Sequence, residues 1–375
     1  MNILILNPFF EPYAGGTEKH LLNIGKRLSK KHNITVLTAR LKDTEREEEI
    51  EGMRIVRTPA KIYYKAPKPL VPPVPVFSNH NKDLDVLAKD ADIIHMHNRF
   101  VYGSFEGTRI KKYGKKVCLT IHNARTEGID AVTDFFGCLF DDTFGRKLMM
   151  SCDGITSVSG AVMESTVPKD YKGLKKVIYN GVDEKLFVPG KKTDWRKKLG
   201  IKRGMVLTNV RLITQKGIEY LMKGMTDVDA ELVVFGRGPL ENKLMKLADK
   251  LDVKVHFLRD YISDKDLASL VADCDCFVLP SLYEPCAVAL VEALSCGLPI
   301  VATDAGGNKE LVEDGKNGFI VPVKDPKAIA EKVNMILGDK KLAEKFGKRS
   351  RGRVLKKFNW NYAAKEFNSF YEELI

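Results

Sequence analysis

Two glutamates eight residues apart, Glu284 and Glu292, stand in a segment that joins a predicted strand, residues 276–279, to a predicted helix. We predict that this helix begins at Pro285, because proline has no N–H group to lose at a first helical position. The free N–H groups and positive dipole end of its first turn suit a diphosphate. That turn contains Cys286, Ala287 and Val288. Glu284 could hydrogen-bond sugar hydroxyls and Glu292 a ribose diol. In the alternative interpretation, Glu284 only caps the helix and Glu292 lies on the surface.

Two cations, Arg211 and Lys216, lie five residues apart just after another predicted strand, residues 205–210. A guanidinium can bind a phosphate through two parallel hydrogen bonds, and an ammonium neutralises it as a point charge. Together the two side chains could neutralise a leaving diphosphate. The alternative is that both are ordinary exposed cations of a basic protein. The two glutamates favour the functional interpretation.

Glycines follow two of the predicted strands. Gly15 and Gly16 come after the first strand, and paired glycines let backbone N–H groups approach a phosphate closely. Gly236 opens a second glycine turn, which is a weak signal by itself. None of these glycines completes a Gly-x-Gly-x-x-Gly pattern, so a nicotinamide cofactor is disfavoured. A plain tight turn is the alternative at each place.

Two patterns could hold a metal, and we expect none to be bound. His95, His97 and His122 stand at strand ends. We predict that His95 points into the sheet and that His122 faces the ligand, while His97 could do either. A metal site there would need a converging carboxylate, which the sequence does not offer. Asp273 and Asp275 match an Asp-x-Asp pattern that binds Mg²⁺ or Mn²⁺ elsewhere, but they sit at a predicted helix end, where a structural role is favoured.

Short apolar runs alternate with segments of helical spacing along the chain, which is typical of parallel sheets with helices on both faces. In such sheets ligands bind beyond the carboxyl ends of the strands, where the side chains above are found. The further predicted strands span residues 3–6, 34–37, 54–57, 92–96, 117–121, 154–158, 231–235, 254–258, 299–302 and 319–321.

The 375 residues exceed one ordinary α/β core, so we predict two Rossmann-like doubly wound domains with a cleft between them. The turn at residues 180–183 places the domains at 1–180 and 181–358, with a helical tail at 359–375. Five prolines between residues 65 and 75 predict a loop. The acidic run at residues 43–51 predicts a solvated face.

Composition narrows the class of protein. A hydrophobic fraction of 44% is typical of a globular chain, and no apolar run approaches the ~20 residues of a membrane span. The apolar residues 1–6 predict a first strand and not a signal peptide. Seven scattered cysteines fit a reducing cytoplasm and no disulfide framework. The formal net charge of +12 is compatible with binding to phosphorylated substrates, to an anionic membrane or to nucleic acid. Nucleic acid is the least favoured of these partners because no nucleic-acid-binding motif is visible.

Taken together and in order, these motifs resemble the family 4 retaining glycosyltransferases, which have the GT-B fold. The resemblance covers nearly the whole chain, and the Glu-x7-Glu segment with its proline is its most specific part. The matching segments are 15–18, 94–97, 120–122, 177–183, Arg211 with Lys216, 236–239, and 284–292.

The resemblance also implies roles for single residues. Arg211 and Lys216 would bind the donor diphosphate together with the Gly16 N–H group. Glu292 would hold the ribose, and Glu284 the transferred sugar. Backbone near Tyr261 would contact the base of the donor. His122 would lie between the donor sugar and the acceptor. The tail after Trp360 would return to the N-terminal domain.

We therefore expect a retaining hexosyltransferase of carbohydrate biosynthesis that uses a UDP- or GDP-linked sugar, without a cofactor or metal. The acceptor is unidentified, and a lipid-linked or envelope glycan is one option. A nucleotide-sugar epimerase and a non-catalytic nucleotide-sugar binding module are the alternatives, and an NAD oxidoreductase ranks third. Four lysines at 111, 112, 115 and 116 suggest reversible contact between a cytoplasmic enzyme and an anionic membrane, with a merely solvated surface equally favoured.

Overall fold

The computed structural model describes residues 1–13, 15–64, 73–99, 110–125, 131–190, 194–260 and 262–375. The chain divides into two compact units. The first unit consists of Met1–Tyr179 together with Trp360–Ile375, and the second consists of Asn180–Asn359. Both observed boundaries lie one residue from the predicted ones. Tyr261, which was predicted to lie near the base, falls outside the described residues.

The first unit is built on an eight-stranded sheet in the order β10-β9-β8-β7-β1-β2-β4-β3. All neighbours pair in parallel except β3, which runs antiparallel to β4. The strand order reverses between β1 and β7, which is where ligands bind in sheets of this kind. The strands are β1 Asn2–Leu6, β2 Asn33–Ala39, β3 Glu47–Ile50, β4 Met53–Thr58, β7 Ile93–His97, β8 Lys116–Ile121, β9 Gly154–Ser157 and β10 Leu174–Val177.

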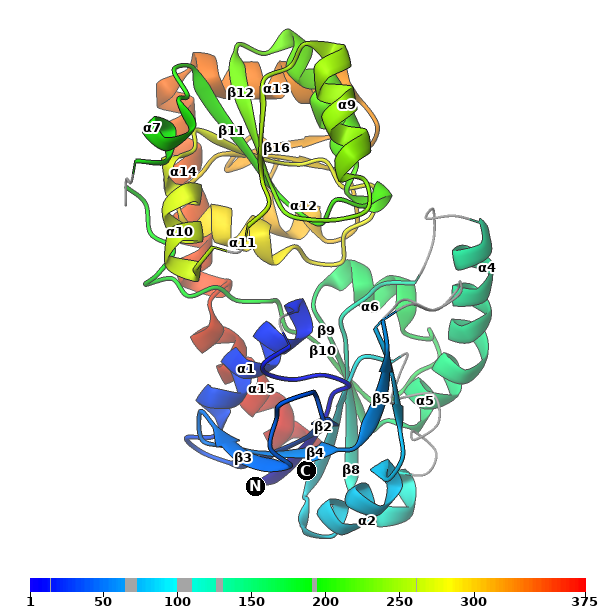
Figure 1. Ribbon diagram of the computed structural model, residues 1–375. Helices are drawn as coiled ribbons and strands as arrows, with labels where there is room; N and C mark the ends of the chain where they lie inside the picture. The colour runs from blue at the N-terminus through cyan, green and yellow to red at the C-terminus, as the bar shows by residue number, and fades with distance from the viewer. Residues whose placement is uncertain (14, 65–72, 100–109, 126–130, 191–193, 261) are drawn as a thin grey trace. The chain divides into compact units, whose positions relative to one another are not determined.

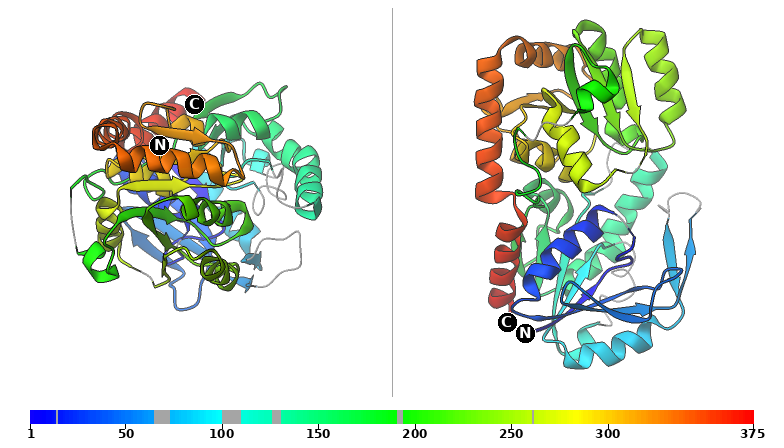
Figure 2. Two further views of the ribbon diagram at one scale, coloured as in Figure 1. Left: turned by 90° about the horizontal axis from the view of Figure 1, so that it is seen from above. Right: turned by 60° about the vertical axis from the view of Figure 1, so that its left-hand side comes forward.

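Helices cover this sheet, and two from opposite ends of the chain pack together: α1 and α15. They lie side by side in Figure 1 and in the right view of Figure 2, where α1 is blue and α15 is red. The helices of the unit are α1 Gly16–Leu28, α2 His80–Asp90, α4 Ala131–Phe140, α5 Arg146–Ser151, α6 Gly160–Thr166 and α15 Trp360–Leu374. A 3₁₀ turn at Lys111–Tyr113 and a π-helix at Asp141–Gly145 complete the set.

The second unit has a six-stranded, all-parallel sheet in the order β13-β12-β11-β14-β15-β16. Its order reverses between β11 and β14, the strands that precede the predicted cations and glutamates. The strands are β11 Gly204–Asn209, β12 Ala230–Phe235, β13 Val255–Leu258, β14 Cys276–Leu279, β15 Ile300–Thr303 and β16 Gly318–Val321.

Several helices accompany this second sheet. Helix α8 contacts α9 and α13, α11 contacts α10 and α14, and α13 also contacts α14. The helices are α7 Trp195–Leu199, α8 Ile218–Gly224, α9 Glu241–Leu251, α10 Asp264–Asp273, α11 Val288–Ser295, α12 Asn308–Leu311, α13 Pro326–Gly338 and α14 Lys340–Lys357. Each unit is thus a doubly wound α/β domain, as predicted. Among the described helices, none combines the length and apolar character needed to cross a bilayer.

The acidic run at 43–51 is exposed, as predicted, and it also contains the edge strand β3, which pairs with β4 and was not predicted. Residues 65–72 of the proline-rich stretch lie outside the described residues, and its end was predicted wrongly: β6, Val74–Phe77, includes Pro75 and pairs antiparallel with β5, Ala60–Tyr63. A proline is tolerated there because the ribbon has only two strands, so both are edges. Strand β10 was also missed.

The tail helix α15 completes the core of the first unit. Its buried face joins a cluster that also contains residues of β1, β2, β4, β7 and α1. Gly154 marks how closely it approaches the sheet, because a Cβ there would lie 2.7 Å from Phe370 Cζ and 2.8 Å from Leu374 Cδ1. The apolar face of α15 consists of Trp360, Ala363, Ala364, Phe367, Phe370, Tyr371 and Leu374.

We predict that Phe370→Ala lowers the free energy of unfolding of the first unit by about 3–5 kcal/mol, because it leaves a cavity against β9. The exposed Phe135, at 64% exposure, is the matched control, and its replacement by alanine should change stability by less than about 0.5 kcal/mol. A Trp195→Phe background leaves Trp360 as the single tryptophan and as a reporter of this unit. Urea unfolding followed by its fluorescence measures both effects. Equal losses for the two variants would contradict the packing described here.

Candidate functional site

In the second unit, three loops beyond the carboxyl ends of strands approach one another backbone to backbone. Gly236, with φ +142°, follows β12, and a Cβ there would overlap the carbonyl oxygen of Val210 beyond β11. The Leu212 N–H donates to the Arg237 carbonyl at 2.8 Å. Gly217, with φ +59°, allows the β11 loop to lie against the carbonyl oxygen of Pro280 beyond β14. These glycines are therefore required for the loops to meet, and Gly236 lies where it was predicted.

The two predicted cations lie in this loop cluster but in different environments. Arg211 follows β11 directly and its side chain is exposed. Lys216 ends the 3₁₀ turn Thr214–Lys216, and its Nζ lies 2.6 Å from Glu284 Oε2. The exposed fractions of the two paired side chains are 16% and 5%. The structure thus brings Lys216 and Glu284 together, although they are 68 residues apart in sequence.

Glu284 is anchored at both its side chain and its backbone. The Ser281 hydroxyl donates to Glu284 Oε2 at 3.0 Å, alongside the ion pair with Lys216. Its own carbonyl accepts from the Gly307 N–H at 3.0 Å, and Gly306, at φ +49°, comes so close that a Cβ would overlap that carbonyl. Loops after β11, β14 and β15 therefore hold this carboxylate. It does not cap α11, whose N-cap Ala287 makes no side-chain capping bond.

Helix α11 begins at Val288, three residues later than predicted. Pro285 precedes the helix because the chain between Glu284 and Ala287 is still extended around the loop cluster, with Ala287 at φ −74° and ψ 113°. Glu292 is 4% exposed, so the alternative that placed it on the surface is wrong. Burial raises the pKa of the Cys286 thiol to about 12, which keeps it neutral and disfavours it as a nucleophile.

The Asp-x-Asp pattern has structural partners in the second unit. Asp273 Oδ2 accepts from the Trp195 N–H at 3.0 Å. Asp275 Oδ2 accepts from Arg196 Nη2 at 2.5 Å and from the Met205 N–H at 2.8 Å. These bonds tie α7 to the start of β11, which agrees with the structural role predicted for both carboxylates.

In the first unit, the predicted glycines open α1. Gly15 is the N-cap and Gly16 the first residue of the helix. A Cβ on Gly16 would meet nothing within 4 Å, so open space lies over this N–H group, whereas a Cβ on Gly15 would overlap the carboxylate of Glu18. Glu18 is buried, accepts from Asn7 Nδ2 at 3.3 Å, and has a raised pKa because burial disfavours its charge. Glu18 belongs to the matching segment 15–18, but no role was predicted for it, although an acidic residue in a first helical turn is a recognisable signal.

Beyond β1, β7 and β8 the first unit gathers four histidines. His95 is buried, with Nδ1 2.6 Å from the Tyr371 hydroxyl and Nε2 2.7 Å from Thr120 Oγ1, so it points into the core as predicted. His97 Nδ1 lies 3.0 Å from His122 Nε2. His20, on α1, was missed by the sequence analysis. Its position one turn after Gly16, on the buried face of the helix, is the signal that could have found it.

Three of these imidazoles, His95, His97 and His122, are neutral. Burial, followed by repulsion from neighbouring imidazoles, lowers the pKa of His95 to about 3 and lowers the pKa values of His97 and His122 well below the usual value. A neutral imidazole offers one N–H donor and one lone pair. His122, which is partly exposed, can therefore donate to or accept from a ligand group.

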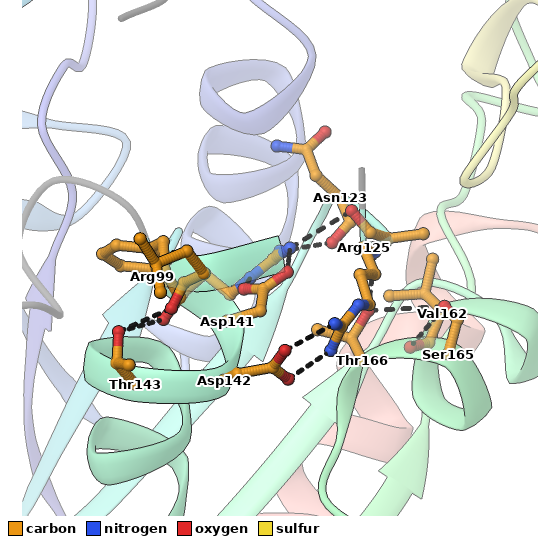
Figure 3. Close-up of polar contacts among 12 residues, drawn as sticks. Arg99, Asn123, Arg125, Asp141, Asp142, Thr143, Val162, Ser165 and Thr166 are labelled. Atoms are coloured by element: carbon orange, nitrogen blue, oxygen red, sulfur yellow. Dashed lines mark hydrogen bonds and ion pairs between the residues drawn. The ribbon is translucent and has the colours of Figure 1, made fainter. Parts of the chain in front are cut away.

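A buried arginine braces the chain just after His122, as Figure 3 shows. Arg99 is 1% exposed, and its Nε and Nη2 donate to the two carboxylate oxygens of Asp141 at 2.7 and 3.0 Å. Its Nη1 donates to the Asn123 carbonyl, and its Nη2 also donates to the Ala124 carbonyl at 3.1 Å. One side chain thus fixes two consecutive carbonyls beside His122. Nothing in the sequence marked Arg99 for this role, because its partners are 24 to 42 residues away.

A second arginine repeats the pattern on the neighbouring residues (Figure 3). Arg125 binds both carboxylate oxygens of Asp142, at 2.6 and 2.7 Å, and its N–H donates to Thr166 Oγ1 at 3.0 Å. Asp142 belongs to the π-helix Asp141–Gly145. A π-helical turn is common at functional sites. Here it presents two adjacent carboxylates to two arginines and so holds the loop after β8.

The matches to known families and proteins cover the whole chain. Residues 14–186 match the model described as Glycosyltransferase Family 4, and residues 191–353 match the model described as Glycosyl transferases group 1. The chain belongs to glycosyltransferase family 4. This family 4 glycosyltransferase is 29% identical to an uncharacterized glycosyltransferase of Methanocaldococcus jannaschii, over 96% of this chain and 94% of the relative. It is 24% identical to N-acetyl-alpha-D-glucosaminyl L-malate synthase of Bacillus anthracis, over 97% and 95%.

Solved structures agree on the fold of this family 4 glycosyltransferase. Sucrose-phosphate synthase from Thermosynechococcus elongatus superposes with a TM-score of 0.81 at 22% identity, covering 100% of this chain and 98% of that one. HepE from Anabaena, solved in complex with UDP-glucose, superposes with a TM-score of 0.80 at 20% identity, covering 100% of both chains. The protein therefore has the GT-B fold that the motifs predicted.

The lowered pKa of His95 predicts how stability depends on pH. Above pH ~6.5 this imidazole is neutral in both the folded and the unfolded chain. Below that pH His95 is protonated in the unfolded chain but stays neutral in the folded chain, where its pKa is about 3. The free energy of unfolding therefore falls by about 1.4 kcal/mol per pH unit. We expect His95→Gln to remove this contribution and to make the decline between pH 6.5 and 4 shallower. Urea unfolding of chelator-treated protein, followed by Trp360 fluorescence, measures both slopes, and parallel slopes would refute the assignment.

Proposed function

We propose that this family 4 glycosyltransferase moves a hexosyl group from a UDP- or GDP-linked sugar to an acceptor hydroxyl, with retention of anomeric configuration. The observation that carries the proposal is the buried pair of Lys216 and Glu284 in the loop cluster of the second unit, beside the exposed Arg211. A cation for the diphosphate and a carboxylate for the sugar thus lie within one hydrogen bond of each other. The complex of HepE with UDP-glucose supports a nucleotide-sugar donor for a chain of this fold.

Donor binding follows from the chemistry of these groups. Arg211 is exposed, so its guanidinium is available for a bidentate contact with the diphosphate. Lys216 would add a second positive charge while remaining close to Glu284. The N–H groups at the start of α11 and the positive end of its dipole would add to this field. Glu292 lies one turn further along α11, and we assign it to the ribose diol.

In the proposed reaction the bond between the anomeric carbon and the phosphate oxygen breaks, and its electron pair leaves with the nucleoside diphosphate. Arg211 and Lys216 stabilise the charge that develops on that leaving group. The acceptor oxygen attacks from the same face, and its proton passes to the departing phosphate oxygen. Glu284 contacts sugar hydroxyls in this scheme, and no covalent enzyme intermediate is required. The resemblance assigns His122 to the sugar and the Gly16 N–H group to the phosphate.

Two other functions make different products. An epimerase would return a nucleotide-linked sugar with inverted stereochemistry at one carbon and would need no acceptor. A binding module would leave the donor intact. Both are tested by incubating the protein with a donor and following nucleoside diphosphate release, with and without candidate acceptors.

The donor proposal predicts two linked results. In a panel of nucleoside diphosphates and their sugars, the matching donor should raise the melting temperature of the protein by mass action. Lys216→Ala should then lower kcat more than it raises the donor KM, because Lys216 acts on charge that develops in the transition state. The matched control is Lys223→Ala, on α8 and exposed, which should leave both constants unchanged. If Lys216→Ala changed KM alone, Lys216 would serve ground-state binding only.

The acceptor is proposed to be presented at an anionic membrane. The lysines at 111–116 support this weakly, because Lys112 pairs with Asp85 at 2.7 Å and Lys115 donates to the Lys89 carbonyl at 2.8 Å. A stronger basic surface lies on α14, whose 18 residues include nine Lys and Arg against one Glu. One face of α14 is buried, and the other carries a stripe at helical spacing. The exposed lysines of this stripe are Lys341, Lys345, Lys348 and Lys356.

Each lysine near an anionic surface contributes about 1 kcal/mol, so this α14 stripe predicts salt-sensitive binding to vesicles that contain phosphatidylserine. The test variant combines Lys341→Glu, Lys345→Glu and Lys348→Glu. The matched control reverses three exposed lysines of α9 and changes the net charge equally; they are Lys243, Lys246 and Lys250. Co-sedimentation at low salt should be lost in the α14 variant and kept in the α9 control. Equal behaviour of the two variants, or equal binding to neutral vesicles, would favour an acceptor away from membranes.

A further inference from the structure

Three imidazoles of the first unit converge from three different elements. His20 comes from α1, His97 ends β7, and His122 follows β8. One ring nitrogen from each can be chosen so that all three lie within 4.8 Å of one another. His97 Nδ1 and His122 Nε2 are 3.0 Å apart. The three ligand atoms thus lie close together near the carboxyl ends of β7 and β8.

The spacing of the rings matches the geometry of a bound transition ion. The ring centroids of the three histidines are separated by 5.0, 5.3 and 5.8 Å. A tetrahedral Zn²⁺ with Zn–N bonds of about 2.1 Å holds imidazole centroids roughly 5.2 Å apart. The spacing of the three rings is thus compatible with ligation of one ion, which would replace the hydrogen bond between His97 and His122.

Packing holds the trio on one side and leaves one of its rings partly exposed. Trp360 and Phe367 of α15 stand edge-on to the His20 ring at 5.7 Å and fix its plane. His122 is the partly exposed member, which leaves an approach for the ion and a position for a fourth ligand.

We propose that His20, His97 and His122 form a binding site for a divalent first-row transition ion of the Zn²⁺ class. Three imidazoles suit zinc, cobalt, nickel and copper, whereas magnesium and calcium prefer oxygen ligands. This inference goes beyond the proposed transfer reaction, in which two side-chain cations and a helix dipole stabilise the leaving group. An ion on His122 would occupy the group assigned to the sugar, so metal binding would inhibit transfer and a chelator would preserve or raise activity.

The direct test is titration of chelator-treated protein with Co²⁺, without donor or acceptor. Tetrahedral Co²⁺ absorbs visible light far more strongly than the hydrated ion, so the spectrum reports both binding and geometry. We expect one saturable site that Zn²⁺ displaces. His20→Gln and, separately, His122→Ala should weaken Co²⁺ binding by more than about tenfold, since loss of even an outer-shell partner costs about 10–100-fold. His122→Ala is included because truncation of a partly exposed ring is the less disruptive change.

Two histidines outside the trio provide the controls. His95→Gln removes a buried ring of the same layer whose nitrogens contact Tyr371 and Thr120, and His32→Gln removes a partly buried ring that contacts Asn368. Both should keep the Co²⁺ site, and thermal melting checks that every variant is folded. Absence of a saturable tetrahedral spectrum, or binding unchanged in His20→Gln and His122→Ala, would overturn the proposal. Neither result bears on the donor panel or on Lys216→Ala, so failure of the metal site and failure of the transfer reaction remain distinguishable.

Discussion

The buried ion pair between Lys216 and Glu284 is the interaction on which the second unit's site depends. Two charges removed from water cost free energy unless they are paired and hydrogen-bonded, and here Ser281 supplies the additional bond. The pair can form only because loops from non-adjacent stretches meet backbone to backbone. That approach requires glycine at 217 and 306, where a Cβ would overlap a carbonyl oxygen. Packing of the loops therefore comes first, and the charge chemistry follows from it.

In the first unit the equivalent constraint is the return of α15. Its aromatic face closes the core over β1, β2 and α1, and the Tyr371 hydroxyl reaches His95 in that core. Tyr371 and Phe367 of this helix contact His95, whose pKa burial lowers. Trp360 and Phe367 also contact the His20 ring. Helix α15 therefore contributes to the environment of side chains that α1 and β7 carry.

Much of this organisation could be predicted because the buried strands of parallel sheets are short apolar runs that are followed by loops. The predicted strands at 205–210 and 276–279 correspond to β11 and β14, and Lys216 and Glu284 meet between them. The failures are equally physical. Strands β3 and β6 carry glutamates or a proline and lie at edges, so neither alternation nor burial marked them. The start of α11 was placed three residues early because Pro285 fits a first helical turn as well as the loop before one.

Contacts distant in sequence explain what the sequence analysis could not find. Arg99 looks like any other arginine until the π-helix brings Asp141 to it, and His20 looks like one polar residue of α1 until β7 and β8 place two more imidazoles beside it. In both cases the partners of the side chain are distant in sequence, so local periodicity does not predict the contact. A histidine at the end of a predicted strand can be predicted to face a ligand from the sequence alone. The surroundings of a histidine on a helix are known only when the elements packed against that helix are known. A single sequence can therefore predict the edge of the sheet where chemistry occurs, but only the packed structure shows which neighbouring groups share that edge.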